Sequence, residues 1–396
     1  MTWTQTTPEE ERTRFVLKAS AEELEFAELC RLFSISRKTG YKWLDRYRRD
    51  GAAGLEARSS APHTHPFAVG AEVRERVIGL REEHATWGPR KLLAFLERHA
   101  PKTKWPAPST VGELLRCAGL VRPRRRRRRC PPATQPFVEA REPNDLWCAD
   151  FKGQFPVGKR MCYPLTVTDA ASRYVLGCDA LRSTETSGAK AGFEGVFQKY
   201  GLPGAIRTDN GSPFASTGAG GLSRLSVWWV HLGILPERIE PGEPQQNGRH
   251  ERMHLTLELE ATTPARRSFA AQQRVFDEWR RVFNHERPHE ALDMRTPGDL
   301  YVPSRRSMPS VLPEVEYPGG WELRRVRHDG TMKWRNRHLY VSAALVGELV
   351  GLRPEDGGLW TGFFGPILLG RVHDEALDLG LVRPSRRQWT DDEEGE

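Results

Sequence analysis

The first 60 residues show the hydrophobic period of α-helices. A compact helical stretch follows Ser20 and ends near Phe33, a break is expected at residues 34–36, and a second helix comes after it. Residues three, four and seven positions apart lie on one side of an α-helix, so the second helix has one apolar face and one basic face. The apolar face consists of Gly40, Trp43, Leu44 and Tyr47.

Two helices joined by a short break, the second of them basic, form the pattern of a helix-turn-helix unit. Such a unit presents its second helix to the major groove of DNA. We therefore predict a DNA-binding domain over residues 1–60. An ordinary three-helix bundle with a solvated basic face is the alternative. The predicted DNA contacts are Arg37, Lys38, Tyr41 and Lys42.

A second helical pattern extends over residues 67–122, after a linker rich in Ser, Pro and His. Its last helix is expected to have Ser109 as the N-cap, since a serine hydroxyl accepts a hydrogen bond from a free N–H group of the first turn. We predict a second, less typical helical DNA-binding domain here. A basic linker rich in Arg and Pro follows over residues 123–143.

Six consecutive arginines stand in this linker. Like charges repel, so the run should stay extended and solvated until a polyanion neutralises it. We expect that polyanion to be the phosphate backbone of DNA; a solvated linker with no partner is the alternative. The run consists of Arg124, Arg125, Arg126, Arg127, Arg128 and Arg129.

From residue 144 the helical period gives way to short runs of aromatic and β-branched residues, which are typical of strands. Over residues 144–302 three strands, a helix, a strand, a helix, a short strand and a helix follow one another, an α/β order. Strand-like runs return over residues 310–384, where a small β-barrel is expected. Residues 385–396 are an acidic tail that we expect to be disordered. The chain is thus predicted to be multidomain.

Composition narrows the class of protein. The length of 396 residues suits roughly two to three domains at ~100–200 residues each. The net charge of +8 favours a polyanionic partner. No run reaches the ~18 apolar residues of a membrane span, and the N-terminus is unlike a signal peptide, so we expect a cytoplasmic protein without a membrane partner. The six cysteines are scattered, which argues against a disulfide scaffold and a zinc site.

Three carboxylates stand where strands and a helix could bring them together. Asp150 lies on the first strand of the α/β region, Asp209 ends a later strand before an Asn-Gly turn, and Glu251 lies in the first turns of a helix. Three acids within a few ångströms repel one another unless cations neutralise them. Hard oxygen ligands suit Mg²⁺ or Mn²⁺ rather than Zn²⁺. We expect two such ions, which can assist an in-line displacement at phosphorus.

Other residues near Glu251 compete for roles. Glu258 shares a helix face with Glu251, and helix geometry alone does not exclude it. The remaining nearby glutamates are Glu240, Glu243 and Glu260. For His250 and His254 we favour helix-surface polarity or a DNA-backbone contact over metal ligation. Trp228, Trp229 and Trp279 are expected in the core. The chain has no Gly-x-x-x-x-Gly-Lys loop, so we expect no nucleotide hydrolysis.

The runs WCADFKG, RTDNGSPF and PGEPQQNGRHERMHLTLE occur in that order. They resemble the DDE integrase core of bacterial insertion-sequence transposases and retroviral integrases, and the run from Asn284 to Tyr301 looks like the signature that follows it. The resemblance covers essentially the whole chain. It implies a ribonuclease-H-like catalytic core over residues 144–302. It also implies that Asp150, Asp209 and Glu251 form a metal-binding catalytic triad.

The chain departs from the family pattern in two places. Forty-one residues separate Asp209 from Glu251, more than is usual in the family, and we attribute the surplus to a surface-loop insertion at residues 214–226. Seven residues after the glutamate the family tends to carry Lys or Arg, but this chain has Glu258. Arg249, Arg252 or another basic group is expected to make the DNA contact instead.

The resemblance implies a Mg²⁺-dependent DNA transposase. It would bind the ends of a mobile element, hydrolyse the phosphodiester there and join the 3′-hydroxyls to target DNA. Because an element has two ends, a homo-oligomer assembled on DNA is expected. An accessory ATPase is a further possible partner. The alternatives are a DNA-binding regulator without catalysis and a simple metal-dependent ribonuclease-H-like nuclease.

Overall fold

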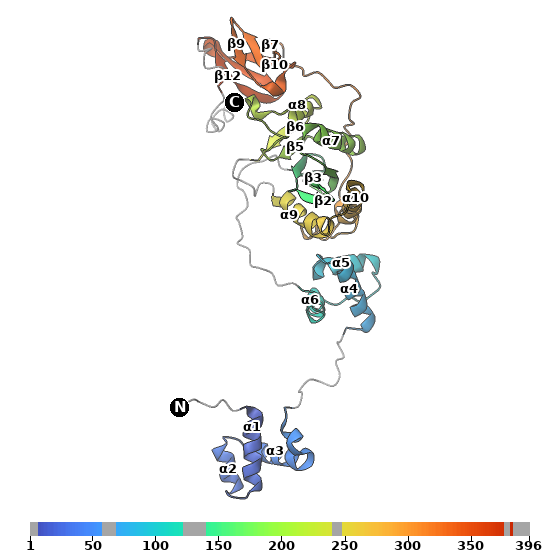
Figure 1. Ribbon diagram of the computed structural model, residues 1–396, viewed down its shortest axis with the longest axis vertical. Coiled ribbons are helices and arrows are strands. Elements are labelled where there is room, and N and C mark those ends of the chain that lie inside the picture. The colour runs from blue at the N-terminus through green and yellow to red at the C-terminus, as the bar shows by residue number, and fades with distance from the viewer. Residues whose placement is uncertain (1–6, 58–68, 122–139, 240–247, 376–380, 383–396) are drawn as a thin grey trace. The chain divides into compact units, whose positions relative to one another are not determined.

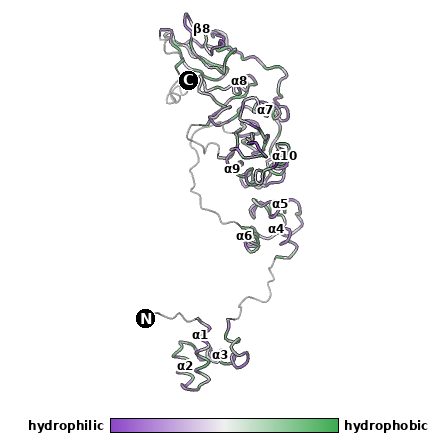
Figure 2. Tube along the Cα trace, viewed as in Figure 1, coloured by the Kyte–Doolittle hydropathy of each residue, from purple (hydrophilic) through white to green (hydrophobic). Residues whose placement is uncertain are grey.

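The computed structural model describes residues 7–57, 69–121, 140–239, 248–375 and 381–382. The chain divides into two compact units, residues 1–69 and 70–396. The arginine run at 124–129, the acidic tail, Glu240 and Glu243 lie outside the described residues. None of the described helices is long and apolar enough to cross a membrane. Figure 2 accordingly shows hydrophobic stretches that are short and interrupted.

The first unit contains three α-helices and a 3-10 turn. They are α1 (Pro8–Ser20), α2 (Phe26–Leu32), α3 (Arg37–Asp50) and η1 (Gly51–Leu55). The expected break between α2 and α3 is confirmed, and the Ser36 hydroxyl caps α3 by accepting a hydrogen bond from the Thr39 N–H at 3.1 Å. A Cβ on Gly40 would lie 2.8 Å from the Cys30 Sγ, so glycine allows α3 to approach α2 closely.

The second unit begins with three helices, which are α4 (Ala71–Glu83), α5 (Pro89–His99) and α6 (Pro108–Cys117). They enclose a small core that includes the fully buried Trp87 and Leu92. The prediction that Ser109 caps α6 is wrong. The N-cap residue is Ala107, because Pro108 takes the first helical position, where a missing N–H costs nothing.

A six-stranded mixed sheet forms the centre of this unit (Figure 1). Strand β3 pairs with β1, β2 and β4 in antiparallel fashion, and β1 pairs with β5, and β5 with β6, in parallel. The sequence predicted three strands before the first helix of this region, whereas four precede it, because the three-residue β2 was missed; the helices and strands after them follow in the expected α/β order. The strands are β1 (Leu146–Phe151), β2 (Phe155–Val157), β3 (Arg160–Asp169), β4 (Val175–Leu181), β5 (Ala205–Thr208) and β6 (Leu235–Arg238).

Helices cover both faces of the sheet. Helices α7 (Thr186–Tyr200) and α8 (Arg224–His231) pack on one face, in a core that contains Trp229. Helices α9 (Gly248–Leu257) and α10 (Phe269–His285) pack on the other, in a core that contains Trp279. The burial expected for Trp228, Trp229 and Trp279 is confirmed. A π-helical turn, η4 (Glu258–Thr262), extends α9.

Residues 214–226 are not the surface-loop insertion that the sequence suggested. The segment holds the 3-10 turn η2 (Ala219–Gly221) and the start of α8, and its side chains Phe214, Leu222 and Leu225 are 1–2% exposed. Leu222 joins the core of the C-terminal sheet, whereas Leu225 joins the core under α7. Apolar residues between the glycines explain this burial, and the glycine content alone misled the prediction.

The expected small β-barrel is not confirmed. In the described residues, β7 (Glu322–Arg325), β10 (Leu349–Pro354), β11 (Leu359–Phe364) and β12 (Ile367–His373) form a four-stranded sheet whose edges, β7 and β12, do not pair with each other. Strands β8 (Thr331–Trp334) and β9 (Arg337–Tyr340) form a separate hairpin. The short turns are η5 (Glu290–Leu292), η6 (Pro297–Asp299), η7 (Ala343–Leu345) and η8 (Asp356–Gly358). The strand pattern was correct, but it carries no information about closure.

Candidate active site

The parallel pairing of β1 and β5 positions the first two acids. Cys148 pairs with Arg207, and two residues further along each chain Asp150 stands level with Asp209, just beyond the end of β5. Neighbouring strands lie ~4.8 Å apart, so both carboxylates lie at one edge of the sheet. A hydrogen bond of 3.1 Å from the Gly211 N–H to the Asp209 carboxylate fixes the turn.

The alternation of β1 determines which face Asp150 occupies. Trp147 and Ala149 belong to the core beneath α7 and α8. Successive side chains of a strand point to opposite faces, so Cys148 and Asp150 point toward the face that α9 covers. Asp150 pairs with Thr166 of β3, so the two side chains share that face.

Electrostatic interaction links the three predicted acids. Burial, and after it repulsion from Asp209 and from Glu251, together raise the pKa of Asp150 to about 7, although a hydrogen bond from the Phe151 backbone opposes the shift. Glu251 itself lies exposed in the first turn of α9. A half-buried carboxyl next to two others is unfavourable as an anion unless a cation compensates. This donor set of carboxylate oxygens therefore fits Mg²⁺ or Mn²⁺.

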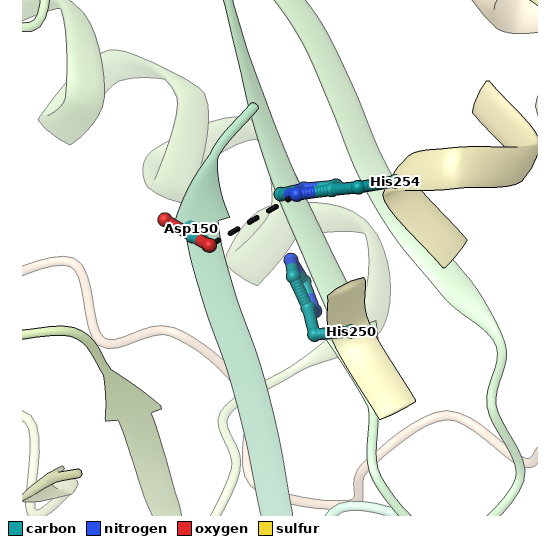
Figure 3. A group of neighbouring side chains, drawn as sticks. All are labelled: Asp150, His250 and His254. Carbon is teal, nitrogen blue, oxygen red and sulfur yellow. Dashed lines mark ion pairs between the residues drawn. The ribbon is translucent and has the colours of Figure 1, made fainter. Parts of the chain in front are cut away.

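His250 and His254 do not lie on a free helix surface, as the sequence suggested. His250 is 2% exposed, and both side chains project from α9 toward the sheet, where His254 Nδ1 lies 3.9 Å from the Asp150 carboxylate (Figure 3). Burial lowers the pKa of both histidines, in His254 to about 4, so both are neutral near pH 7.

Two threonines of β3 bind the histidines. The Thr166 hydroxyl lies 2.8 Å from His250 Nε2 and 2.7 Å from His254 Nε2, and it donates to the Asp150 carbonyl oxygen at 3.1 Å. The Thr168 hydroxyl lies 3.0 Å from His250 Nδ1. Ligand atoms of Asp150, His250 and His254 all lie within 4.8 Å of one another. Both nitrogens of His250 are already hydrogen-bonded, however, which makes it a poor metal ligand.

The competing glutamates have other partners. The Glu258 carboxylate pairs with the Lys152 ammonium group at 3.0 Å. The Glu260 carboxylate accepts a hydrogen bond from the Trp279 indole N–H at 2.9 Å and pairs with Arg287. Neither contributes to the pKa shift of Asp150, whereas Glu251 does.

The predicted DNA contacts are exposed wherever their side chains are described. Arg37, Lys38, Tyr41 and Lys42 all lie on the exposed side of α3, and Arg252 is exposed on α9. The Arg249 side chain lies outside the described part of the chain, as does the arginine run. The basic face of α3 is thus exposed to solvent within the first unit.

Sequence reasoning missed Lys152, Thr166 and Thr168. The threonines alternate on β3 with Leu165 and Val167, which belong to the core on the opposite face. That period of two could have placed them beside Asp150 once the pairing of β1 with β3 was known. Lys152 stands two positions after Asp150, the interval that places two strand residues on one face.

Comparison with known families supports this architecture. Residues 140–244 and 232–297 match integrase core domains, residues 11–63 match a helix-turn-helix domain, and residues 39–115 match a homeodomain-like domain. The central sheet therefore has the ribonuclease-H-like fold of the retroviral-integrase-like superfamily, preceded by helical DNA-binding domains. Integrase cores belong to the metal-dependent polynucleotidyl transferases.

Two curated relatives come from bacterial insertion elements. The chain is 26% identical over 232 residues to the IS407 protein of Burkholderia multivorans, covering 58% of this chain and 80% of that one. It is 27% identical over 278 residues to the IS476 protein of Xanthomonas euvesicatoria, covering 67% and 75%. Together with the family matches, these relatives support an insertion-sequence transposase of the retroviral-integrase-like superfamily.

Solved retroviral structures are also similar. The HTLV-2 integrase catalytic core domain in complex with magnesium is 14% identical, with 41% of this chain and all of that chain covered and a TM-score of 0.34. A chain of the simian T-cell lymphotropic virus intasome in complex with PP2A regulatory subunit B56 gamma is 16% identical, with 75% of this chain and 99% of that chain covered and a TM-score of 0.37. Scores this low add nothing to the assignment, which rests on the family matches.

Proposed function

We propose that the chain is a DNA transposase that cuts at the ends of a mobile element and joins them to target DNA. Asp150, Asp209 and Glu251 would hold two Mg²⁺ or Mn²⁺ ions. The observation that carries the proposal is the level position of Asp150 and Asp209 across the parallel β1–β5 pair, with Glu251 close enough to raise the pKa of Asp150. If these acids were only helix caps or turn residues, they would have no reason to lie close together.

The chemistry would proceed in two displacements at phosphorus. In the first, a water oxygen attacks the phosphodiester at the element end, and the bond from phosphorus to the 3′-oxygen breaks to release a 3′-hydroxyl. In the second, that hydroxyl attacks a target phosphodiester and displaces its 3′-oxygen. Bound divalent ions would supply charge neutralisation for both the entering and the leaving oxygen.

The chain's own residues would position the reacting groups. Asp150 and Asp209 lie at a rigid sheet edge, and rigid placement lowers the entropic part of the barrier. Thr166, held against the Asp150 carbonyl oxygen and both histidines, would keep α9 and therefore Glu251 in register with the sheet. No covalent bond between protein and DNA is needed.

The remaining parts of the chain would bind DNA. The helical domains at residues 1–60 and 67–122 would recognise the terminal repeats, and the linker at 123–143 would follow the phosphate backbone. The proposed domain boundaries also include the catalytic core at 144–302, a C-terminal region at 310–384 and a tail at 385–396. Closure of the C-terminal region into a barrel is not confirmed. We propose assembly as a homo-oligomer on DNA in the cytoplasm. The accessory ATPase has no support from the family matches.

The test is incubation of the full chain with Mg²⁺ and DNA that carries the sequences flanking its gene. Joined products support transposition, cleavage alone supports a nuclease, and a bound but unaltered duplex supports a regulator. Asp209→Asn should abolish both cutting and joining. Asp277→Asn, on the exposed side of α10, is the matched control and should keep them.

A further inference from the structure

One cation lies against the acidic site without being part of it. The Lys152 ammonium group pairs with the Glu258 carboxylate at 3.0 Å, and the two side chains are 14% and 55% exposed. The Lys152 charge lowers the pKa of His254, whose ring lies 3.9 Å from the Asp150 carboxylate. Lys152 therefore lies near the histidine that contacts Asp150, two residues after Asp150 in the chain.

The backbone holds Lys152 in place more firmly than Glu258. The Lys152 N–H donates to the Pro164 carbonyl oxygen at 2.9 Å, which extends the pairing of β1 with β3 by one residue. Glu258 begins the π-helical turn η4, and more than half of its side chain faces solvent. An exposed carboxylate of this kind can rotate away at small cost, because surface ion pairs contribute only ~0–1 kcal/mol.

The charges around Lys152 indicate which group could replace the Glu258 carboxylate at its ammonium group. Asp150, Asp209 and Glu251 interact electrostatically, and in the described part of the chain Lys152 pairs with a further carboxylate, Glu258. A DNA phosphate that approaches the carboxylates needs a cation next to it, since a like charge at ~4 Å costs about 1 kcal/mol even in water. Position 258, two helical turns after Glu251, is itself an acid and supplies no such cation.

We propose that Lys152 binds a phosphodiester of the DNA backbone beside the carboxylates, and that Glu258 occupies its ammonium group until DNA displaces it. The proposal rests on the proposed function, because it names a DNA contact of that same site. Lys152 then supplies from the strand the positive charge that the helix lacks. Glu258 acts as a competitor that weakens DNA binding.

DNA binding without divalent metal tests this separately from catalysis. The full chain is titrated against a fluorescent duplex in EDTA, and anisotropy gives Kd across a range of KCl concentrations. Lys152→Gln should weaken binding by about 3–10-fold and lower the slope of log K against log salt by ~0.9, as expected for one lost phosphate contact. Lys152→Arg should restore both values.

Glu258→Gln should tighten binding by about 3-fold or more, and this gain should disappear in the Lys152→Gln background. The matched controls are Lys190→Gln and Glu194→Gln, an exposed ion pair of 3.7 Å on α7, which should change Kd by less than about 2-fold. Thermal melting of each variant verifies the fold.

The proposal is overturned if Lys152→Gln behaves like Lys190→Gln, or if Glu258→Gln tightens binding equally with and without Lys152. The second result would make Glu258 a source of general repulsion. A chain that binds DNA but forms no joined product refutes the proposed transposition. The proposal for Lys152 is then still tested by the slope of log K against log salt. A chain that binds no DNA refutes both.

Discussion

Helices α3 and α9 differ in what they bury. Helix α3 buries Gly40 and Leu44 and exposes its basic residues, as an amphipathic helix should. Helix α9 buries His250 beside Met253 and Leu257, and exposes Glu251 and its basic neighbour Arg252. The first helix is held by apolar packing, the second also by hydrogen bonds to threonines of β3.

This difference shows that the polar face of a helix can either face solvent or pack against the rest of the protein. On α3 the polar side is exposed to solvent within the first unit, which suits recognition of another molecule. On α9 part of the polar side faces the sheet, and a buried histidine is tolerated there because both its nitrogens have partners. Such bonds fix rotation of the helix about its axis, which determines where Glu251 points.

The largest expected effect comes from the acid that faces α9. Asp150→Asn should lower DNA joining by at least about 10³-fold, because charge stabilisation of that order is lost. The same change should stabilise the metal-free protein at pH 8. Burial and repulsion raise the folded-state pKa to about 7, so the stability that protonation supplies is complete below pH ~4 and is lost as pH rises through 7.

Melting curves at pH 5 and pH 8 in EDTA measure this trade-off. At pH 8 the wild type carries the cost of an ionised Asp150 and the variant does not, so the variant should gain ~2 kcal/mol in its core transition. At pH 5 the gain should shrink. Asp277→Asn on the exposed side of α10 is the control. Equal stability of Asp150→Asn and wild type at both pH values would contradict the prediction that ionised Asp150 destabilises the metal-free protein.

Sequence patterns predicted α3 better than α9 for a physical reason. Hydrophobic period reports which side of a helix meets an apolar core, so the burial of Leu44 followed from spacing. The burial of His250 depends on Thr166 and Thr168, which are more than 80 residues away in the chain. Only the pairing of β3 with β1 brings them together, and no local pattern records it.

The α/β order after β4 and the strands and helix that carry the three acids could likewise be predicted from the sequence, since motifs and turns are local. The burial of residues 214–226 and the open edges of the C-terminal sheet could not. Leu222 is buried because strands from beyond residue 320 cover it. Such contacts between distant segments determine whether a glycine-rich stretch is a surface loop.

The second prediction sharpens the contrast between the two sides of α9. His250→Ala removes the partner of the Thr168 hydroxyl and leaves a void, so it should destabilise the core by ~3 kcal/mol. Arg252→Ala, on the exposed side of the same helix, should change stability by less than ~0.5 kcal/mol. Thermal melting of the full chain measures both. Similar losses for the two variants would show that the hydrogen bonds of His250 do not hold α9.

The smallest effect tests how α3 begins. Ser36→Ala removes the hydroxyl that accepts the Thr39 N–H, and it should cost the first unit about 1 kcal/mol. Ser109→Ala is the matched control, because α6 is preceded by Ala107 at its cap and Ser109 lies within the helix, where alanine is the better helix former. Hydrogen exchange of the α3 and α6 amides separates the two helices in the intact chain. Faster exchange confined to α3 in Ser36→Ala agrees with local capping, whereas equal protection in both variants would mean that apolar packing around Leu44 alone stabilises α3.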